Sequence, residues 1–158
     1  PMIRGIHHVA VSTPNLERIV AFYCDVMGAE QVYDGGWEKG SDIIDQIVGL
    51  KGSSCKQAML KLHNAYLEFF EYQTPTPEPK DPAYPPNNHG YTHFCIDVVD
   101  IDAEYERLTK AGVKFNIAPP DFEGGDIRAT YGRDPDGNII EIQEILNEDH
   151  AFYLDAGK

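Results

Sequence analysis

Two short stretches decide the fold: Gly5-Ile-His-His-Val-Ala-Val11 near the start of the chain and Gly90-Tyr-Thr-His-Phe-Cys-Ile-Asp-Val98 beyond its middle. Apolar and polar residues alternate in both, which predicts a β-strand. Apolar residues at spacings of three and four follow each strand and end at a glycine, Gly28 or Gly112, which predicts an amphipathic helix. The chain therefore contains a repeated strand–helix unit.

Further short strands follow each predicted helix, so both copies read β-α-β-β-β. These strands are Gln31–Asp34, Gln57–His63 and Tyr66–Tyr72 in the first copy, and Lys114–Asn116, Asp126–Tyr131 and Ile139–Ile145 in the second. Ser41–Leu50 predicts an extra helix within the first copy. The predicted organisation is a first module at 1–72, a proline-rich linker at 73–89, a second module at 90–146 and a polar tail at 147–158.

Composition narrows the class of function. The chain has 158 residues, of which 26 are acidic and 13 basic, and a formal net charge of −13. Without a basic cluster, this charge argues against nucleic acid and against an anionic membrane surface as partners. The three cysteines are widely spaced, which predicts free thiols in a reducing compartment. No apolar run is long enough for a membrane span, so we expect a cytoplasmic protein.

Strand alternation places four ionisable residues on the same kind of face. The more apolar face of each strand should pack on the helices, and His8, Glu68, His93 and Glu141 lie on the other face of their strands. Bulky apolar neighbours make it costly to expose that face to water, so it predicts a pocket. Those neighbours are Ile6, Tyr66, Phe70, Tyr91 and Ile139.

Two imidazoles and two carboxylates that converge in a pocket would repel one another or become protonated unless they shared a cation. A divalent metal ion accepts neutral imidazole nitrogen and carboxylate oxygen together. The sequence therefore predicts that His8, Glu68, His93 and Glu141 bind one divalent metal. His7 has the opposite parity to His8 and is expected to be structural.

The same residues carry a resemblance to a known family. Ala21-Phe-Tyr-Cys-Asp-Val-Met-Gly28, Tyr66-Leu-Glu-Phe-Phe-Glu-Tyr72 and Asp134-Pro-Asp-Gly-Asn-Ile-Ile-Glu141, together with the two opening stretches, resemble the vicinal oxygen chelate superfamily. The resemblance runs from about Gly5 to Ile145. It implies an α+β fold in which two βαβββ modules form a cupped mixed sheet around a metal site. It also places metal ligands at His8, Glu68, His93 and Glu141.

The resemblance implies three functions, which differ in the part played by the metal. The first is a divalent-metal-dependent lyase, isomerase or epimerase, similar to glyoxalase and methylmalonyl-CoA epimerase, acting on a small carbonyl or carboxylate substrate through a metal-stabilised enolate. The alternative is an extradiol-type dioxygenase on a catecholic substrate, against which a fourth ligand, Glu68, weighs. The third is a metal-free protein that sequesters its ligand, as resistance-type members do.

Individual roles follow for the preferred function. Glu141 or Glu68 removes a proton. Tyr131 is the further catalytic candidate, because it lies ten residues before Glu141, where the resemblance to the extradiol dioxygenases places an active-site tyrosine. The candidate substrate-binding residues are Arg133, Trp37 and Tyr91. The cofactor is expected to be one divalent ion (Zn, Ni, Co, Mn or Fe), and the partners a small-molecule substrate and a second copy in a homodimer.

Overall fold

The structure is a computed structural model that describes residues 1–155. The chain divides after Lys80 into two compact units, which are described separately below. The division falls inside the predicted proline-rich linker, and the last three residues of the predicted tail lie outside the described residues.

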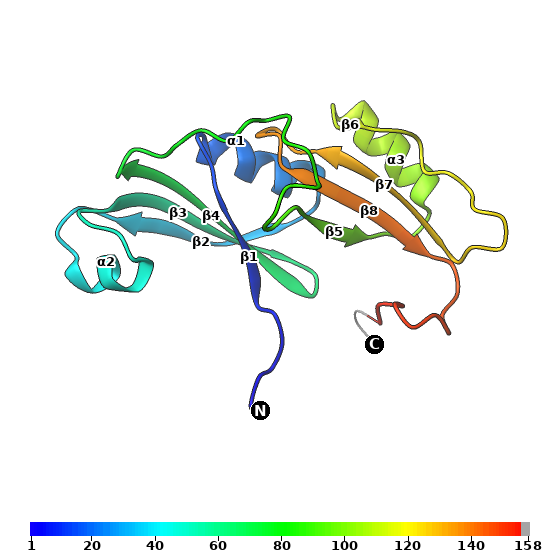
Figure 1. Cartoon of the computed structure of the whole chain (residues 1–158), viewed down its shortest axis with the longest axis horizontal. Coiled ribbons are helices and arrows are strands. Elements are labelled where there is room, and N and C mark those ends of the chain that lie inside the picture. Colours follow the sequence, from blue (N-terminus) through cyan, green and yellow to red (C-terminus); the bar gives the residue numbers. More distant parts are fainter. Residues whose placement is uncertain (156–158) are drawn as a thin grey trace. The chain divides into compact units, whose positions relative to one another are not determined.

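The first unit contains one four-stranded mixed sheet (Figure 1). Its elements are β1 (His8–Ser12), α1 (Leu16–Ala21), the π-helical turn η1 (Phe22–Val26), β2 (Glu30–Trp37), α2 (Asp42–Val48), β3 (Ser54–Leu62) and β4 (Ala65–Thr74). The strands run in the order β1-β4-β3-β2, with β1 parallel to β4 and the other pairs antiparallel. The extra helix that the sequence predicts is α2.

The second unit repeats this plan without the extra helix. Its elements are β5 (His93–Asp97), α3 (Ile101–Lys110), β6 (Lys114–Phe115), β7 (Ile127–Arg133) and β8 (Ile139–Ile145). The order is β5-β8-β7-β6, again with the first two strands parallel and the rest antiparallel. The predicted α+β class and the two βαβββ modules are confirmed.

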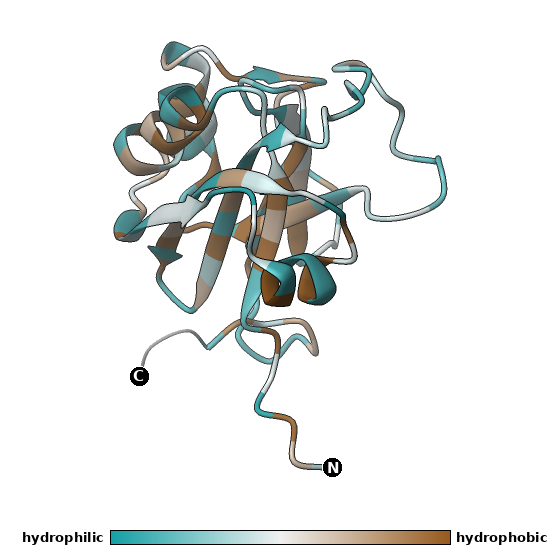
Figure 2. Ribbon diagram, turned by 90° about the vertical axis from the view of Figure 1, so that its left-hand side faces the viewer, coloured by the Kyte–Doolittle hydropathy of each residue, from teal (hydrophilic) through white to brown (hydrophobic). Residues whose placement is uncertain are grey.

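Each sheet buries one face against its own helix, as the alternation predicts. In the first unit, the Tyr23 ring lies 5.2 Å from the Phe69 ring, and Ile19 and Leu60 are fully buried nearby in the core. In the second unit, Ile140 and Ile142 on β8 are fully buried. Two residues of α3, Ile101 and Leu108, are also fully buried. Figure 2 shows the resulting alternation of hydrophilic and hydrophobic bands along the strands.

A glutamate on the last strand of each module binds the start of that module's helix. Glu144 on β8 accepts hydrogen bonds from the backbone N–H groups of Asp100 (2.8 Å) and Ile101 (3.2 Å). Glu71 on β4 accepts one from the backbone N–H of Leu16 at 3.1 Å. These carboxylates satisfy N–H groups that a helix leaves unpaired, and their negative charge interacts favourably with the positive end of the helix dipole. The sequence leads us to expect Glu144 at an exposed strand end; the structure instead gives it this capping role.

Two predicted strand limits are wrong at the ends that matter for the site. The strand expected at 31–34 continues to Trp37, because Gly35 and Gly36 pair with Gln57 and Lys56 of β3. The strand expected from Gly90 begins only at His93. Just before it, the Tyr84 hydroxyl donates to the Thr92 carbonyl (2.6 Å) and accepts from the Ile139 N–H (3.2 Å), so the hydroxyl stands where a direct hydrogen bond between the two strands would be.

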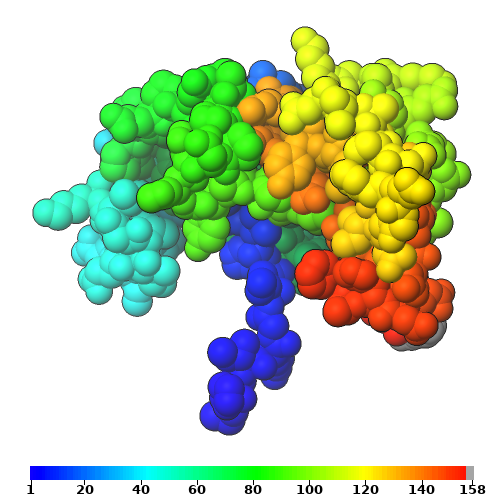
Figure 3. All heavy atoms as spheres, turned by 45° about the vertical axis from the view of Figure 1, so that its right-hand side comes forward, coloured from blue at the N-terminus to red at the C-terminus, as the bar shows by residue number. Residues whose placement is uncertain are grey.

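The described part of the chain, residues 1–155, contains no helix long and apolar enough to cross a membrane. The segment before β1 is exposed and, in the space-filling view of Figure 3, extends away as a narrow arm. Ile6 in this arm is 89% exposed, so the expectation that the pocket face shields it is wrong. The alternation of β1 does not reach Ile6 because the strand starts at His8.

Candidate metal-binding residues and their surroundings

The first unit brings His8 and Glu68 together on the sheet face opposite α1. The His8 Nε2 atom lies 3.5 Å from Glu68 Oε1, with the Glu68 side chain 13% exposed. Glu68 Oε2 accepts a hydrogen bond from Gln57 Nε2 on β3 at 3.0 Å. The His8 Nδ1 atom lies 2.8 Å from Nδ1 of His7, whose ring stacks on Tyr66 at 4.5 Å.

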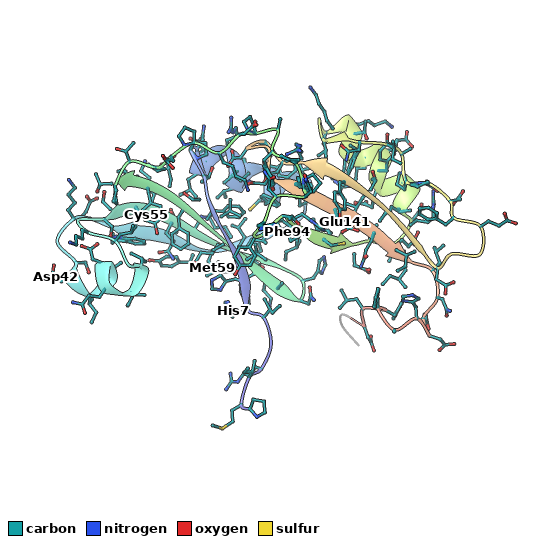
Figure 4. All side chains as sticks on the ribbon, in the orientation of Figure 1. His7, Asp42, Cys55, Met59, Phe94 and Glu141 are labelled. Carbon is teal, nitrogen blue, oxygen red and sulfur yellow. The ribbon has the colours of Figure 1, made fainter. Side chains whose placement is uncertain are left out.

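The second unit brings His93 and Glu141 together in the same way. The His93 Nε2 atom lies 3.0 Å from Glu141 Oε2, and both side chains are about one-fifth exposed, at 22% and 18%. The His93 Nδ1 atom lies 2.7 Å from the Thr92 hydroxyl. A hydroxyl can donate or accept, so Thr92 fits either tautomer of His93. Figure 4 labels Glu141 on its strand.

The two pairs occupy equivalent positions in their sheets. His8 faces Tyr66, two residues before Glu68, and His93 faces Ile139, two residues before Glu141. In both pairs the Nε2 atom faces the carboxylate, and the Nδ1 atom contacts the side chain of the preceding residue. A hydrogen bond at one imidazole nitrogen fixes the ring so that the other nitrogen is aimed at a metal.

The donor set suits a divalent cation, although each pair alone is too small to enclose one. Imidazole nitrogen and carboxylate oxygen are ligands of Zn²⁺, Mn²⁺, Co²⁺, Ni²⁺ and Fe²⁺. Among residues 1–155, no group of three or more His, Cys, Asp or Glu side chains is gathered that would hold a metal by itself. The structure therefore shows two half-sets of ligands, and the prediction that they serve one ion stays a prediction.

Tyr131 and Cys95 surround the second pair. The Tyr131 ring lies 4.5 Å from the His93 ring, and Tyr131 faces Glu141 across the β7–β8 ladder. Burial, reinforced by the Glu141 carboxylate, raises the pKa of the Tyr131 hydroxyl. Desolvation, followed by the charges of Glu141 and Asp97, raises the pKa of the Cys95 thiol to about 12. Both groups therefore keep their protons at neutral pH.

Trp37 belongs to an aromatic cluster near Glu68. Its ring meets Phe70 at 6.1 Å and Tyr72 at 5.8 Å, both edge to face. Its indole N–H donates to the Ser53 hydroxyl at 2.9 Å, and that hydroxyl in turn donates to Asp45 of α2. Trp37 thus connects the sheet to the inserted helix from a strand end, whereas the sequence suggests a loop position.

Arg133 binds the backbone of the segment before β5. Its guanidinium donates to the carbonyl oxygens of Pro82 (3.2 Å), Tyr84 (2.7 Å) and Gly137 (2.9 Å), and it lies over the Tyr84 ring. Three carbonyls therefore occupy the NH1 and NH2 groups, although the sequence predicts that Arg133 binds substrate. We therefore describe Arg133 as the anchor of residues 82–84.

Tyr91 lies outside the strand on which its predicted position depends. Because β5 begins at His93, the alternation that would point Tyr91 toward the pocket does not apply, and the side chain is fully exposed. His7 also departs from its expected place. It precedes β1 and contacts His8 and Tyr66, whereas strand parity predicts that it faces away from His8.

Sequence reasoning misses Gln57, Tyr84 and the two capping glutamates. The caps carry a readable signal, because Glu68-Phe-Phe-Glu71 and Glu141-Ile-Gln-Glu144 repeat the same spacing. Gln57 and Tyr84 have no counterpart in the other module that would reveal them. A groove of about 520 Å³ on the helix side of the first sheet, lined by α1 residues and by Gln31, Lys56 and Glu71, contains none of the predicted site residues.

Comparisons with known proteins identify the family of the chain. A sequence profile of the glyoxalase/bleomycin resistance protein/dioxygenase superfamily matches residues 5–142. A 2-epi-5-epi-valiolone epimerase from an Actinomyces species is 31% identical over 144 residues, covering 87% of this chain and 78% of the relative. The metallothiol transferase FosB of Staphylococcus epidermidis is 24% identical over 159 residues, covering 99% of this chain and 95% of the relative.

A solved structure shares the fold. The crystal structure of a glyoxalase family protein from Bacillus cereus matches with a TM-score of 0.81 and 22% identity, covering 93% of this chain and 97% of that one. The profile match spans most of the chain, and the two modules of the chain have the predicted strand order. The chain belongs to the glyoxalase/bleomycin resistance protein/dioxygenase superfamily, the vicinal oxygen chelate superfamily.

Proposed function

We propose that the protein is a divalent-metal-dependent enzyme that moves a proton at a carbon next to a carbonyl group, as an epimerase, isomerase or lyase. The observation that carries the proposal is the equivalent placing of an imidazole–carboxylate pair in each module, His8 with Glu68 and His93 with Glu141. A purely structural role would not require the same side chains, ring orientation and strand register twice.

The proposed chemistry divides between the ion and the protein. A bound divalent ion would polarise a substrate carbonyl and so acidify the neighbouring C–H bond. Glu141 takes that proton on Oε1, while Oε2 remains directed at His93. Tyr131 keeps its hydroxyl protonated because its pKa is raised, so it can donate a hydrogen bond to a substrate oxygen.

The relatives support a reaction of this kind. One is named an epimerase and another a metallothiol transferase, so members similar to this chain include an enzyme that inverts a stereocentre and one whose name includes a metal. We therefore choose an oxygenated cyclic ketone as the first substrate to test. A homodimer and a cytoplasmic location remain predictions from the sequence.

The test combines metal content with proton exchange. Purified protein is assayed by inductively coupled plasma mass spectrometry, and 2-epi-5-epi-valiolone and small keto acids are incubated with it in D₂O and followed by NMR. We expect bound metal and deuterium incorporation next to the carbonyl, both lost after chelation. Glu141→Gln should slow exchange by about 100-fold or more, the typical contribution of a general base. The tail variant Glu148→Gln should exchange normally.

A second candidate is supported by one contact. The Tyr131 ring lies against His93, and the resemblance to extradiol dioxygenases places an active-site tyrosine at this position. Oxygen uptake with catechols and Fe²⁺ distinguishes the two functions, because proton transfer consumes no oxygen. Rapid uptake would overturn the proposed function. Protein that binds no metal and is not stabilised by Ni²⁺, Zn²⁺, Mn²⁺ or Co²⁺ would instead favour a metal-free binding protein.

A further inference from the structure

Gln57 is the side chain that distinguishes the two carboxylates of the proposed site. It lies on β3 opposite Phe70, two residues along the ladder from Glu68, and its amide donates to Glu68 Oε2 at 3.0 Å. Cross-strand neighbours on this diagonal are close enough for long side chains to meet. The contact is partly shielded from water, since Gln57 is half-buried and the Glu68 side chain is 13% exposed.

The second module lacks this amide. In the first module, Gln57 pairs with Phe70, two residues after Glu68. In the second module, the equivalent position is Ala129, which pairs with Gln143, two residues after Glu141. A methyl group cannot donate a hydrogen bond. The repeat is therefore symmetric in its imidazole–carboxylate pairs and asymmetric in what holds each carboxylate.

The kind of donor also matters. An amide orients a carboxylate without neutralising it, whereas a lysine or arginine at the same place would cancel the charge that a cation needs. With Oε2 occupied by Gln57, Oε1 is the oxygen left beside His8 Nε2, at 3.5 Å. Groups that orient metal ligands in this way typically change metal affinity by about 10- to 100-fold.

We propose that Gln57 is a positioning residue that holds Glu68 by Oε2 and presents Oε1 as the ligand oxygen beside His8. This inference rests on the proposed function, because it requires that the protein bind a divalent metal. It makes Glu68 the fixed ligand and leaves proton transfer to Glu141, whose matching position offers no amide.

The experiment measures Co²⁺ binding to full-length wild-type protein and to Gln57→Leu, by titration and by visible absorption. Gln57→Leu should weaken Co²⁺ binding by about 10- to 100-fold and change the absorption bands, since the ligand field depends on how Glu68 is held. The matched control is Gln143→Leu, which removes a strand glutamine whose amide lies 3.5 Å from Asp97. That control should bind Co²⁺ with wild-type affinity and spectrum.

A double-mutant cycle tests whether Gln57 acts through Glu68. In a Glu68→Ala background, Gln57→Leu should cause no further loss of Co²⁺ affinity, because the carboxylate that it orients is gone. Thermal unfolding of the metal-free variants confirms that each is folded. An equal loss in both backgrounds, or wild-type affinity and spectrum for Gln57→Leu, would overturn the inference and leave the proposed function standing. Wild-type protein that binds no Co²⁺, Zn²⁺, Ni²⁺ or Mn²⁺ would overturn both.

Discussion

Two glutamates on the last strand of each module face opposite sides of the sheet. Residues three apart on a strand point to opposite sides, so Glu68 and Glu141 face the proposed site while Glu71 and Glu144 face the helices. The second glutamate in each copy binds backbone N–H groups at the start of α1 or α3. The Glu-x-x-Glu spacing thus encodes one ligand candidate and one helix cap.

Loss of the cap on α3 should destabilise the protein. Glu144→Ala removes the acceptor for two N–H groups, and losing a cap of this kind costs about 1 kcal/mol, with a range of about 0.5–2 kcal/mol. Glu144→Gln should lose less, because its carbonyl oxygen still accepts one bond. Urea denaturation measures the change, with exposed Glu148→Ala as the control. Equal stability of Glu144→Ala and the control would contradict the capping role.

The thiol of Cys95 should react unusually slowly with alkylating reagents. Only the thiolate is nucleophilic, and a pKa of about 12 leaves very little of the thiol ionised at pH 8, although the Cys95 residue is exposed. In metal-free protein, its rate of alkylation by iodoacetamide should rise about tenfold per pH unit from pH 8 to 10. Peptide mass spectrometry gives the rate at Cys95, and urea-unfolded protein serves as the reference. A plateau near pH 9 would show an ordinary thiol.

At this scale, alternation predicts the faces of His8, Glu68, His93 and Glu141, because each lies within the bounds of a regular strand, His8 and His93 as its first residue. It fails for Tyr91 and His7, which lie just outside strands whose starts depend on long-range contacts. The Tyr84 hydroxyl bridges the Thr92 carbonyl and the Ile139 N–H, and nothing in the local sequence announces that bridge. Gln57 was not predictable for the same reason, since its role depends on the pairing of β3 with β4.

At the scale of elements, β2 depends on a glycine where a side chain cannot fit. A Cβ atom on Gly36 would collide with the Cys55 backbone carbonyl, and the backbone there has φ of +138°. Gly36→Ala should therefore destabilise the first sheet by about 1–3 kcal/mol.

Gly5→Ala is the matched control for that substitution, because Gly5 has φ of +147° and open space around it. It should change the midpoint of thermal unfolding much less than Gly36→Ala does. Equal midpoints for the two variants would show that the close approach of β2 and β3 does not exclude a side chain at Gly36.

Arg128 joins α3 to the loop before β7, and this connection should be sensitive to acid. Its guanidinium makes two hydrogen bonds to Asp102 (2.8 and 2.9 Å) and one to the Pro119 carbonyl. The hydrogen bonds from Arg128 lower the pKa of Asp102 below 3.8. A carboxyl whose pKa is lower in the folded state stabilises the protein above its unfolded value of about 4, and the contribution disappears as pH falls through the folded value.

The corresponding variant is Asp102→Asn. Its melting temperature should fall less steeply than that of wild type as the pH is lowered from 5 to 2.5, and it should be less stable than wild type at pH 7. The exposed tail variant Asp149→Asn should follow the wild-type curve. Parallel curves for wild type and Asp102→Asn would contradict the assignment.

The order and type of the helices and strands were predictable because the spacing of apolar residues is a local property of the sequence. The ends of the strands were less predictable, since they depend on pairing with other strands. Gly35 and Gly36 read as a turn until β3 pairs with them, and α1 passes into the π-helical η1 without a sequence signal such as proline. The inserted helix was predictable because Asp42–Val48 is apolar at helical spacing, with Gly49 ending it in the left-handed conformation.

At the scale of the whole molecule, the repeat makes a quantitative prediction for metal binding. If both imidazole–carboxylate pairs serve the ion, His8→Gln and His93→Gln should each weaken Zn²⁺ binding by about tenfold or more, and to similar extents, with one ion per wild-type chain. Isothermal titration calorimetry measures both the affinity and the stoichiometry. Exposed His89→Gln is the control. Loss of binding in only one of the two variants would restrict the site to one module.

Duplication also frees one copy to change while the other is kept. The helix α2 and the Trp37–Ser53–Asp45 connection have no counterpart in the second module, where residues 116–126 join β6 to β7 without a helix, and the Gln57 amide has none either. Insertions or substitutions there alter the surroundings of one carboxylate without touching the strands that carry the other. A chain built this way can vary one half around its imidazole–carboxylate pair while the pair in the other half stays unchanged.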